Sequence, residues 1–302
     1  MIKKVLSKSF MRPIVDSEDR YLMGTGEQRA YLYDQKMKEL IKIFPFGAEG
    51  RFNKESNRIL LSQRRGVFSI YDIKENVMLL TQKLPRGSSL DPASPCCFYS
   101  DNILLFETKK GREKQIMRYN IAENSFHVIH RSYWNYTLVG KMGDACICYY
   151  CEHIDNQIKI RLIKLNEEGE IASKIVDTDG FNTLLYKDNY YYIYQCQDNC
   201  YEIRCMNENF EECQIGYIKR KKSFFVDQLC LDEKYIAFIC KNRGDYKTES
   251  LIVYDRINEK EIIEEKCPQF TMDLLLTKDT VYIGAMDALY CCELDRHSDD
   301  AN

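Results

Sequence analysis

The feature that most constrains the fold is a strand–turn–strand pattern that recurs along the whole chain. One clear copy spans residues 251–263, where an apolar strand ends at Asp255, a polar turn follows and a second strand begins. The polar residue that ends the strand recurs at intervals of 38 to 48 residues, at Asp34, Asp72, Asn120, Asn166, Asn207, Asp255 and Asp295. Repeats of about 40 to 50 residues are typical of four-stranded propeller blades. Seven phased turns therefore predict seven blades.

A second set of polar turns, independent of the first, precedes an apolar strand in each repeat. These turns lie at 18–20, 56–58, 101–102, 143–144, 188–189, 232–234 and 278–279. Asp, Asn, Gly and Ser are favoured in hairpin turns because they adopt left-handed φ or hydrogen-bond their own backbone. Each repeat thus predicts an inner strand, a turn, a second strand, a variable loop, a third strand, a turn and an outer strand.

The two ends of the chain predict how the ring closes. Residues 296–302 are polar and offer no apolar outer strand, so the seventh blade lacks one strand. Residues 1–8 contain an apolar stretch that is similar to the outer strand at 40–43. Adding this stretch to the last blade removes an exposed sheet edge. We therefore predict an all-β, single-domain, seven-bladed β-propeller over 1–302, with four-stranded antiparallel blades, closed by 1–8 and followed by a polar tail.

Two strand ends carry a family resemblance. Tyr71-Asp72 and Tyr254-Asp255 stand where WD-repeat proteins carry Trp-Asp. On these residues the chain resembles a divergent, bacterial-type seven-bladed β-propeller with a WD-repeat-like architecture, over nearly its whole length. It departs from that pattern because its single tryptophan, Trp134, lies elsewhere and the Gly-His signature is missing. The resemblance implies a fold, and it transfers no functional residue.

Composition and charge limit the class of protein and the cellular compartment that we expect. Apolar residues make up 45% and charged residues 29% of the chain, and the net charge is −3, so a folded core is expected and polyelectrolyte behaviour is not. The N-terminus has no apolar segment behind its lysines, and no stretch approaches the roughly 18 apolar residues of a membrane helix. We expect a cytoplasmic protein without membrane contact, whose 14 cysteines are reduced thiols.

The loops of such a propeller divide between two faces. The loops between second and third strands, and the crossings between blades, share one face and are here basic and aromatic, whereas the turns on the other face are short and largely acidic. Arginine pairs with carboxylates or phosphates and aromatic residues anchor contacts, so this face is predicted to bind a partner. In the alternative interpretation, the aromatic residues fill the mouth of the central channel and the charges only maintain solubility. The predicted contact residues are Arg64, Arg65, Lys109, Lys110, Arg112, Arg131, Tyr133, Trp134, Phe181, Lys221, Phe224 and Arg243.

The sequence contains few motifs that indicate a metal site or a catalytic site. The segment 146–153 contains Cys-x-x-Cys and a histidine, and tetrahedral zinc needs four converging ligands. Cys148 and Cys151 point to opposite faces of a strand, so no metal or other cofactor is predicted, although a joint site with the cysteines of 196–205 stays open. Four histidines are present, and no nucleophile elbow, phosphate-binding loop or dinucleotide fingerprint occurs.

The sequence therefore favours a non-catalytic interaction scaffold. The expected partner is a protein or peptide segment of acidic character, with nucleic acid as a second choice. The alternative is a propeller-type lyase or hydrolase with its site at the channel mouth. A third hypothesis is a structural subunit of a larger assembly, whose sign would be exposed apolar outer strands.

Overall fold

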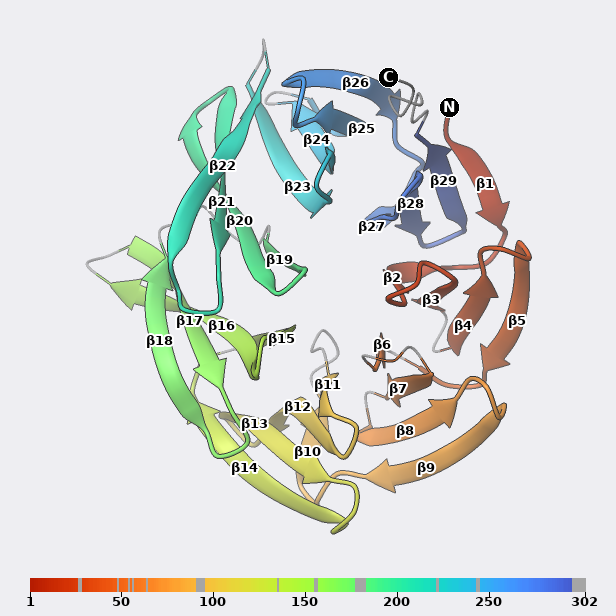
Figure 1. Cartoon of the computed structure of the whole chain (residues 1–302), viewed down its shortest axis with the longest axis vertical. Helices are drawn as coiled ribbons and strands as arrows, with labels where there is room; N and C mark the ends of the chain where they lie inside the picture. The colour runs from red at the N-terminus through yellow and green to blue at the C-terminus, as the bar shows by residue number, and fades with distance from the viewer. Residues whose placement is uncertain are drawn as a thin grey trace, which may run out of the picture.

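The computed structural model describes residues 1–26, 29–47, 49–53, 55, 57–63, 65–90, 96–134, 136–154, 157–176, 183–220, 223–242 and 245–294. Within these residues the chain forms 29 strands and no helix. The strands make seven antiparallel sheets that stand radially around a central axis (Figure 1). The described residues accordingly include no helix with the length and apolarity needed to cross a membrane.

The first four sheets follow each other along the chain. Blade 1 consists of β2 (Met11–Val15), β3 (Tyr21–Gly26), β4 (Arg29–Asp34) and β5 (Glu39–Phe44). Blade 2 consists of β6 (Glu49–Phe52), β7 (Arg58–Ser62), β8 (Val67–Asp72) and β9 (Val77–Lys83). Blade 3 consists of β10 (Ser88–Leu90), β11 (Cys96–Ser100), β12 (Ile103–Lys110), β13 (Glu113–Asn120) and β14 (Ser125–Ser132). Blade 4 consists of β15 (Tyr136–Met142), β16 (Ala145–Ile154), β17 (Gln157–Leu165) and β18 (Glu170–Val176).

The remaining three sheets complete the ring. Blade 5 consists of β19 (Thr183–Tyr186), β20 (Asn189–Gln197), β21 (Cys200–Met206) and β22 (Glu212–Lys219). Blade 6 consists of β23 (Phe224–Leu231), β24 (Tyr235–Asn242), β25 (Asp245–Asp255) and β26 (Lys260–Lys266). Blade 7 consists of β27 (Thr271–Leu276), β28 (Thr280–Ala285), β29 (Leu289–Glu293) and β1 (Lys3–Leu6). The predicted seven-bladed propeller is confirmed, with one addition: blade 3 carries a fifth strand, β10.

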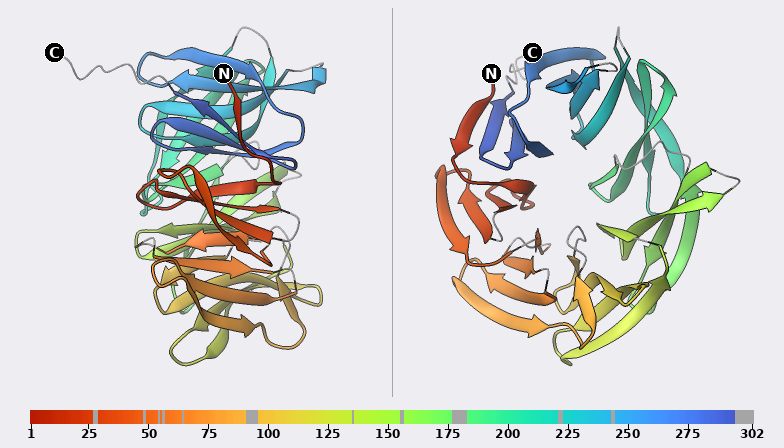
Figure 2. Two further views of the ribbon diagram at one scale, coloured as in Figure 1. Left: turned by 90° about the vertical axis from the view of Figure 1, so that its right-hand side faces the viewer. Right: turned by 180° about the vertical axis from the view of Figure 1, so that it is seen from behind.

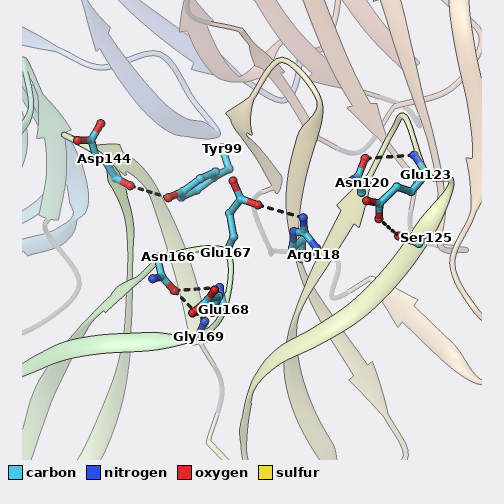
Figure 3. Close-up of polar contacts among 10 residues, drawn as sticks. All are labelled: Tyr99, Arg118, Asn120, Glu123, Ser125, Asp144, Asn166, Glu167, Glu168 and Gly169. Carbon is cyan, nitrogen blue, oxygen red and sulfur yellow. Dashed lines mark hydrogen bonds and ion pairs between the residues drawn. The ribbon is translucent and has the colours of Figure 1, made fainter.

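In six repeats the polar marker residue closes a turn through its own side chain, and the seventh marker, Asp295, lies outside the described residues. Asp72 Oδ1 accepts a hydrogen bond from the Glu75 N–H at 2.8 Å, and Asn120 Oδ1 accepts one from Glu123 at 3.2 Å. Asn166 Oδ1 accepts from the N–H groups of two residues of its turn, at 2.9 and 3.0 Å (Figure 3). Asp and Asn are the residues that satisfy turn backbone in this way. The repeat seen in the sequence is therefore a repeated turn.

Contacts that reach one repeat further along the chain join neighbouring blades. Figure 3 shows two of them between blades 3 and 4: Arg118 pairs with Glu167 at 3.0 Å, and the Tyr99 hydroxyl donates to the Asp144 carbonyl at 2.7 Å. The apolar residues gather in the same places, because each of seven buried clusters of the described residues lies between two successive blades. The core is thus a ring of seven interfaces.

The N-terminal strand closes this ring, as predicted. β1 pairs antiparallel with β29, with Lys3 opposite Cys291, and the two strands lie side by side in the last blade (Figure 2, right). The Ile2 N–H donates to Glu265 Oε2 at 2.7 Å, which ties the strand to blade 6 as well. Val5 and Leu6 pack against the cluster between blades 7 and 1.

Candidate functional site

The predicted contact residues lie on the face formed by the second-to-third-strand loops and the blade crossings, which we call the loop face. Antiparallel pairing within each blade places these segments at one end of the strands and the turns at the other. Among the described residues, Arg65 is exposed in the β7–β8 loop of blade 2. The others that are exposed belong to blade 3 or its crossing to blade 4: Lys109, Lys110, Arg112, Arg131, Tyr133 and Trp134.

The structure brings these six residues together on blade 3, and we call them the blade 3 patch. Lys109 and Lys110 end β12, Arg112 is in the tight β12–β13 turn, and the partner strand β14 brings Arg131 opposite Gln115. The extra strand β10 supports the hairpin from its other side, because Ser89 pairs with Lys109. Four paired strands, β10, β12, β13 and β14, therefore frame the end of the blade at which these cations lie.

Two exposed aromatic side chains lie at the end of the same strand. Tyr133 is 85% exposed and Trp134 is 45% exposed, in the crossing that follows β14. The Trp134 N–H donates to the Ser132 hydroxyl at 2.9 Å, which fixes the start of the crossing. The indole lies against His153 of β16, with ring centroids 6.0 Å apart. Exposed aromatic residues held by a rigid frame are the side chains that most often dominate binding energy at interfaces.

The charge of the patch is only partly neutralised. Arg131 pairs with Glu113 Oε2 at 2.6 Å. A hydrogen bond from Gln115, together with the charges of Arg131 and Lys110, lowers the pKa of Glu113. Within the described part of the chain, Lys109, Lys110 and Arg112 have no ion pair. The patch therefore has an excess of positive charge beside its two aromatic rings.

One predicted contact residue is misplaced, and four cannot be assessed. Phe224 is fully buried, where it packs on Tyr201 and Phe238 in the cluster between blades 5 and 6. Its expected place on the rim is wrong, because inner-strand residues that face a neighbouring blade belong to the core of this fold. Four further predicted residues lie outside the described residues: Arg64, Phe181, Lys221 and Arg243.

Comparison with known proteins adds structural neighbours and no sequence relatives. No protein-family model and no curated protein sequence matches the chain. The β-propeller domain of Cps50 (Swd1) from Myceliophteria thermophila is similar with a TM-score of 0.70 and 8% identity, over 97% of this chain and 100% of that one. The WD40 repeats of RRP9 have a TM-score of 0.62 and 10% identity over 97% of both chains.

An enzyme is found among the neighbours as well. An oligogalacturonate lyase in complex with manganese has a TM-score of 0.67 and 11% identity, over 98% of this chain and 93% of that one. Identities this low show the fold alone. The propeller fold hosts both binding proteins and enzymes, so function has to be argued from the site.

Sequence reasoning missed a charged cluster near the central axis. Arg12 on β2, Arg51 on β6 and Asp273 on β27 are half-buried residues of three inner strands, and β2 packs between the other two. Burial raises the pKa of Asp273 to about 6, although the Leu274 N–H and the two guanidinium groups oppose the rise. The charges of both arginines therefore act on this carboxyl group. Residues 12, 51 and 273 are far apart in the chain, so only the closed ring reveals the cluster.

The backbone at Arg12 is unusual. Its φ of 52° makes it the one non-glycine residue within a described strand that adopts the left-handed region. The pairing of β2 with β3 is irregular between Met11 and Ile14, which is a β-bulge around Arg12. Bulges re-aim side chains and are frequent next to functional sites, and strained residues cluster there.

The cysteines form no recognisable metal centre. All 14 are free, and the described residues contain no group of three or more His, Cys, Asp or Glu side chains that could hold a metal ion. Cys146 and Cys148 pack in the cluster between blades 3 and 4, whereas Cys151 packs in the cluster between blades 4 and 5. The predicted opposition of Cys148 and Cys151 across the sheet is confirmed.

The outer strands of blades 1 and 2 expose apolar side chains. Ile43 of β5 is 45% exposed, and Val77 and Leu79 of β9 are 46% and 48% exposed. Lys42 of β5 donates to the Asn76 side chain at 3.0 Å, so the two blades are in contact at their outer rims. The third hypothesis, a structural subunit of a larger assembly, predicted exposed apolar outer strands of this kind.

Proposed function

We propose that the protein is a non-catalytic interaction scaffold that binds an acidic protein or peptide segment through the blade 3 patch. The supporting observation is the joint exposure of Tyr133 and Trp134 beside a hairpin whose three cations make no ion pair within the described structure. Such a surface provides aromatic anchors and charge complementarity together. The proposal places the protein in the cytoplasm, and its 14 free thiols support a reducing compartment.

The single tryptophan gives a direct assay, because its fluorescence reports on the patch alone. Peptides selected from a random display library against the wild-type protein are expected to be rich in Asp and Glu and to change the Trp134 emission saturably. Charge reversal in Lys110→Glu/Arg112→Glu is expected to weaken their binding roughly tenfold or more, since two attractive contacts become repulsive.

A matched control is available on the opposite face. The double variant Lys74→Glu/Lys278→Glu changes the net charge equally at exposed positions of short turns. It is expected to bind the selected peptides like the wild-type protein. Selected peptides without acidic bias, or equal losses in both double variants, would contradict the proposal. Tighter binding of a single-stranded oligonucleotide than of any selected peptide would assign the patch to nucleic acid.

The enzymatic alternative, a lyase or hydrolase, has one observation in its favour. A carboxyl group with a pKa of about 6 can act as a general acid or base near neutral pH. The neighbouring Arg12 and Arg51 are groups that bind a carboxylate-bearing or phosphate-bearing substrate. Stoichiometric metal in elemental analysis, or turnover of an acidic oligosaccharide that Asp273→Asn abolishes, would favour this alternative over the scaffold.

A further inference from the structure

Blade 5 carries a pair of cysteines on neighbouring strands that the proposed function does not use. Cys205 of β21 lies directly opposite Cys213 of β22 in the antiparallel register (the two strands lie side by side in Figure 1). Opposed residues of antiparallel strands have Cα atoms about 4.5 to 5.5 Å apart. Disulfides span Cα distances of roughly 4.4 to 6.8 Å, so the separation expected for this pair is within the range of a disulfide.

The pair is accessible and has a polar environment. Cys213 is exposed and Cys205 is half-buried. Burial raises the pKa of Cys205, and the adjacent Cys213 thiol raises it further. Tyr191 lies directly opposite Cys205 in the register of β20 and β21. Its hydroxyl and the Arg256 guanidinium act on the pKa of Cys205 in the opposite direction, because both stabilise the thiolate. The net effect is a raised pKa of Cys205, so the exposed Cys213 thiol is the one that meets an oxidant first.

A second pair of neighbouring thiols, which is buried, shows why access of an oxidant matters as well as the distance between the thiols. Cys97 and Cys146 lie between blades 3 and 4 with their sulfur atoms 3.5 Å apart. Both are buried. The hydrogen bond with Cys146 and, second to it, burial raise the pKa of Cys97 well above its ordinary value. No oxidant reaches them without opening the blade interface. Proximity alone therefore does not distinguish the two pairs, whereas exposure does.

We propose that Cys205 and Cys213 form an oxidative modification site, at which hydrogen peroxide produces a reversible disulfide across β21 and β22. The exposed Cys213 thiolate attacks one peroxide oxygen and breaks the O–O bond. This oxygen remains on sulfur as sulfenic acid, and the other takes a proton and leaves as water. The Cys205 thiolate then attacks the Cys213 sulfur, forms the S–S bond and expels the remaining oxygen as a second water. Two thiols are oxidised and one peroxide is reduced to two waters.

Tyr191 is a positioning residue in this scheme. Tyr191 lies opposite Cys205 on the neighbouring strand, and its hydroxyl favours the thiolate that performs the second attack. In Tyr191→Phe, the first step at Cys213 is unaffected and the second slows roughly fivefold, the factor expected from the loss of one hydrogen bond. Cys213 sulfenic acid should then accumulate and be trapped by dimedone, a result that a merely structural role of Tyr191 would not give.

The test uses the reduced full-length chain with stoichiometric hydrogen peroxide, followed by alkylation of the remaining thiols. A glutamate-specific protease cuts at Glu208, Glu211 and Glu212 between the two cysteines, so the disulfide appears as a linked peptide pair in mass spectrometry. The linked pair should form in the wild-type protein, disappear on addition of dithiothreitol, and raise the Tm while present, because a loop is closed.

Two variants make the outcome decisive. Cys213→Ser alters an exposed position and should abolish the linked pair, whereas Cys196→Ser, at another exposed thiol of the same blade, should leave it intact. Recovery of Cys205 and Cys213 as separately alkylated peptides would overturn the proposal. So would recovery of Cys213 only as sulfinic or sulfonic acid, or linked to a different cysteine.

Discussion

Deletion of residues 1–8 tests the closure of the ring most directly. The deletion removes β1, and with it the apolar contacts of Ile2, Val5 and Leu6 with two blade interfaces. Full burial of such a side chain contributes about 1.5 to 3 kcal/mol, so three partly buried ones contribute about 3 kcal/mol together. The paired residues of β1 and β29 add backbone hydrogen bonds worth about 1 kcal/mol each, or roughly 3 kcal/mol more.

The sum of about 6 kcal/mol is a large part of the 5 to 15 kcal/mol that stabilises an ordinary domain. At about 2 °C per kcal/mol, we expect the Tm to fall by roughly 12 °C. The freed edge of β29 should also promote aggregation, because an unpaired strand edge is a template for pairing with another chain. Differential scanning calorimetry and light scattering measure the two effects.

The matched control removes the charges of the strand and keeps its backbone and apolar side chains. Lys3 pairs with Glu293 at 3.2 Å and Lys4 with Asp287 at 3.5 Å, both on the surface, where such pairs contribute about 0 to 1 kcal/mol. Lys3→Ala/Lys4→Ala should therefore melt close to the wild-type protein. If the deletion variant is insoluble, Val5→Asp/Leu6→Asp tests the same contacts. A deletion that leaves the melting curve unchanged would refute closure by β1.

Three further predictions follow from single features. Selected acidic peptides should bind Lys110 and Arg112 less tightly as ionic strength rises, as fluorescence titrations in increasing NaCl will show, because exposed charges are screened. Asp273 has a folded pKa of about 6, which is above its unfolded value. Between pH 4 and 6 the native state therefore binds more protons than the unfolded state, and the protein loses stability as the pH rises through this window. Asp273→Asn should lack this loss, and its stability relative to wild type in urea unfolding should increase by up to about 3 kcal/mol between pH 4 and 7. Asp255→Ala removes an acceptor of two backbone N–H groups and should cost about 2 kcal/mol in urea unfolding, against about 1 kcal/mol for Asp72→Ala, which loses one.

The fold could be predicted from the sequence because its marker residues act locally. Asp72 and Asn120 accept hydrogen bonds from N–H groups only three residues ahead, so their physical role is complete within a few residues of chain. The same holds for the other described turns, whose spacing then fixes the number of blades. Phe224 shows the limit of that reasoning: it lies next to a basic crossing in the sequence, but its burial depends on Tyr201 and Phe238, which belong to other strands.

From the sequence, only the residue types of the candidate site could be predicted, and their arrangement could not. A basic and aromatic loop face was expected around the whole ring. Of the predicted contact residues that the structure describes, six lie on blade 3 or its crossing to blade 4, Arg65 lies on blade 2, and Phe224 is buried. The arrangement of the six residues on blade 3 depends on the pairing of β10 with β12 and on the register that places Arg131 opposite Gln115. Pairing partners of this kind are not encoded in residue type or spacing. The cluster of Arg12, Arg51 and Asp273 was missed for the same reason.

Departures from the repeat are therefore the best guide to function in this chain. A repeated frame stabilises itself through equivalent contacts in every blade, so a feature present in one blade, other than the closing strand β1, is not part of that common frame. Among the described residues, β10 is the one strand outside the four-strand pattern of the blades, and Trp134 is the single tryptophan of the whole chain. Both lie at the loop face of blade 3, where β10 supports the basic hairpin and Trp134 ends the neighbouring strand. Two independent departures at one place are unexpected if that surface only maintains solubility, and this favours the blade 3 patch as the first surface to test.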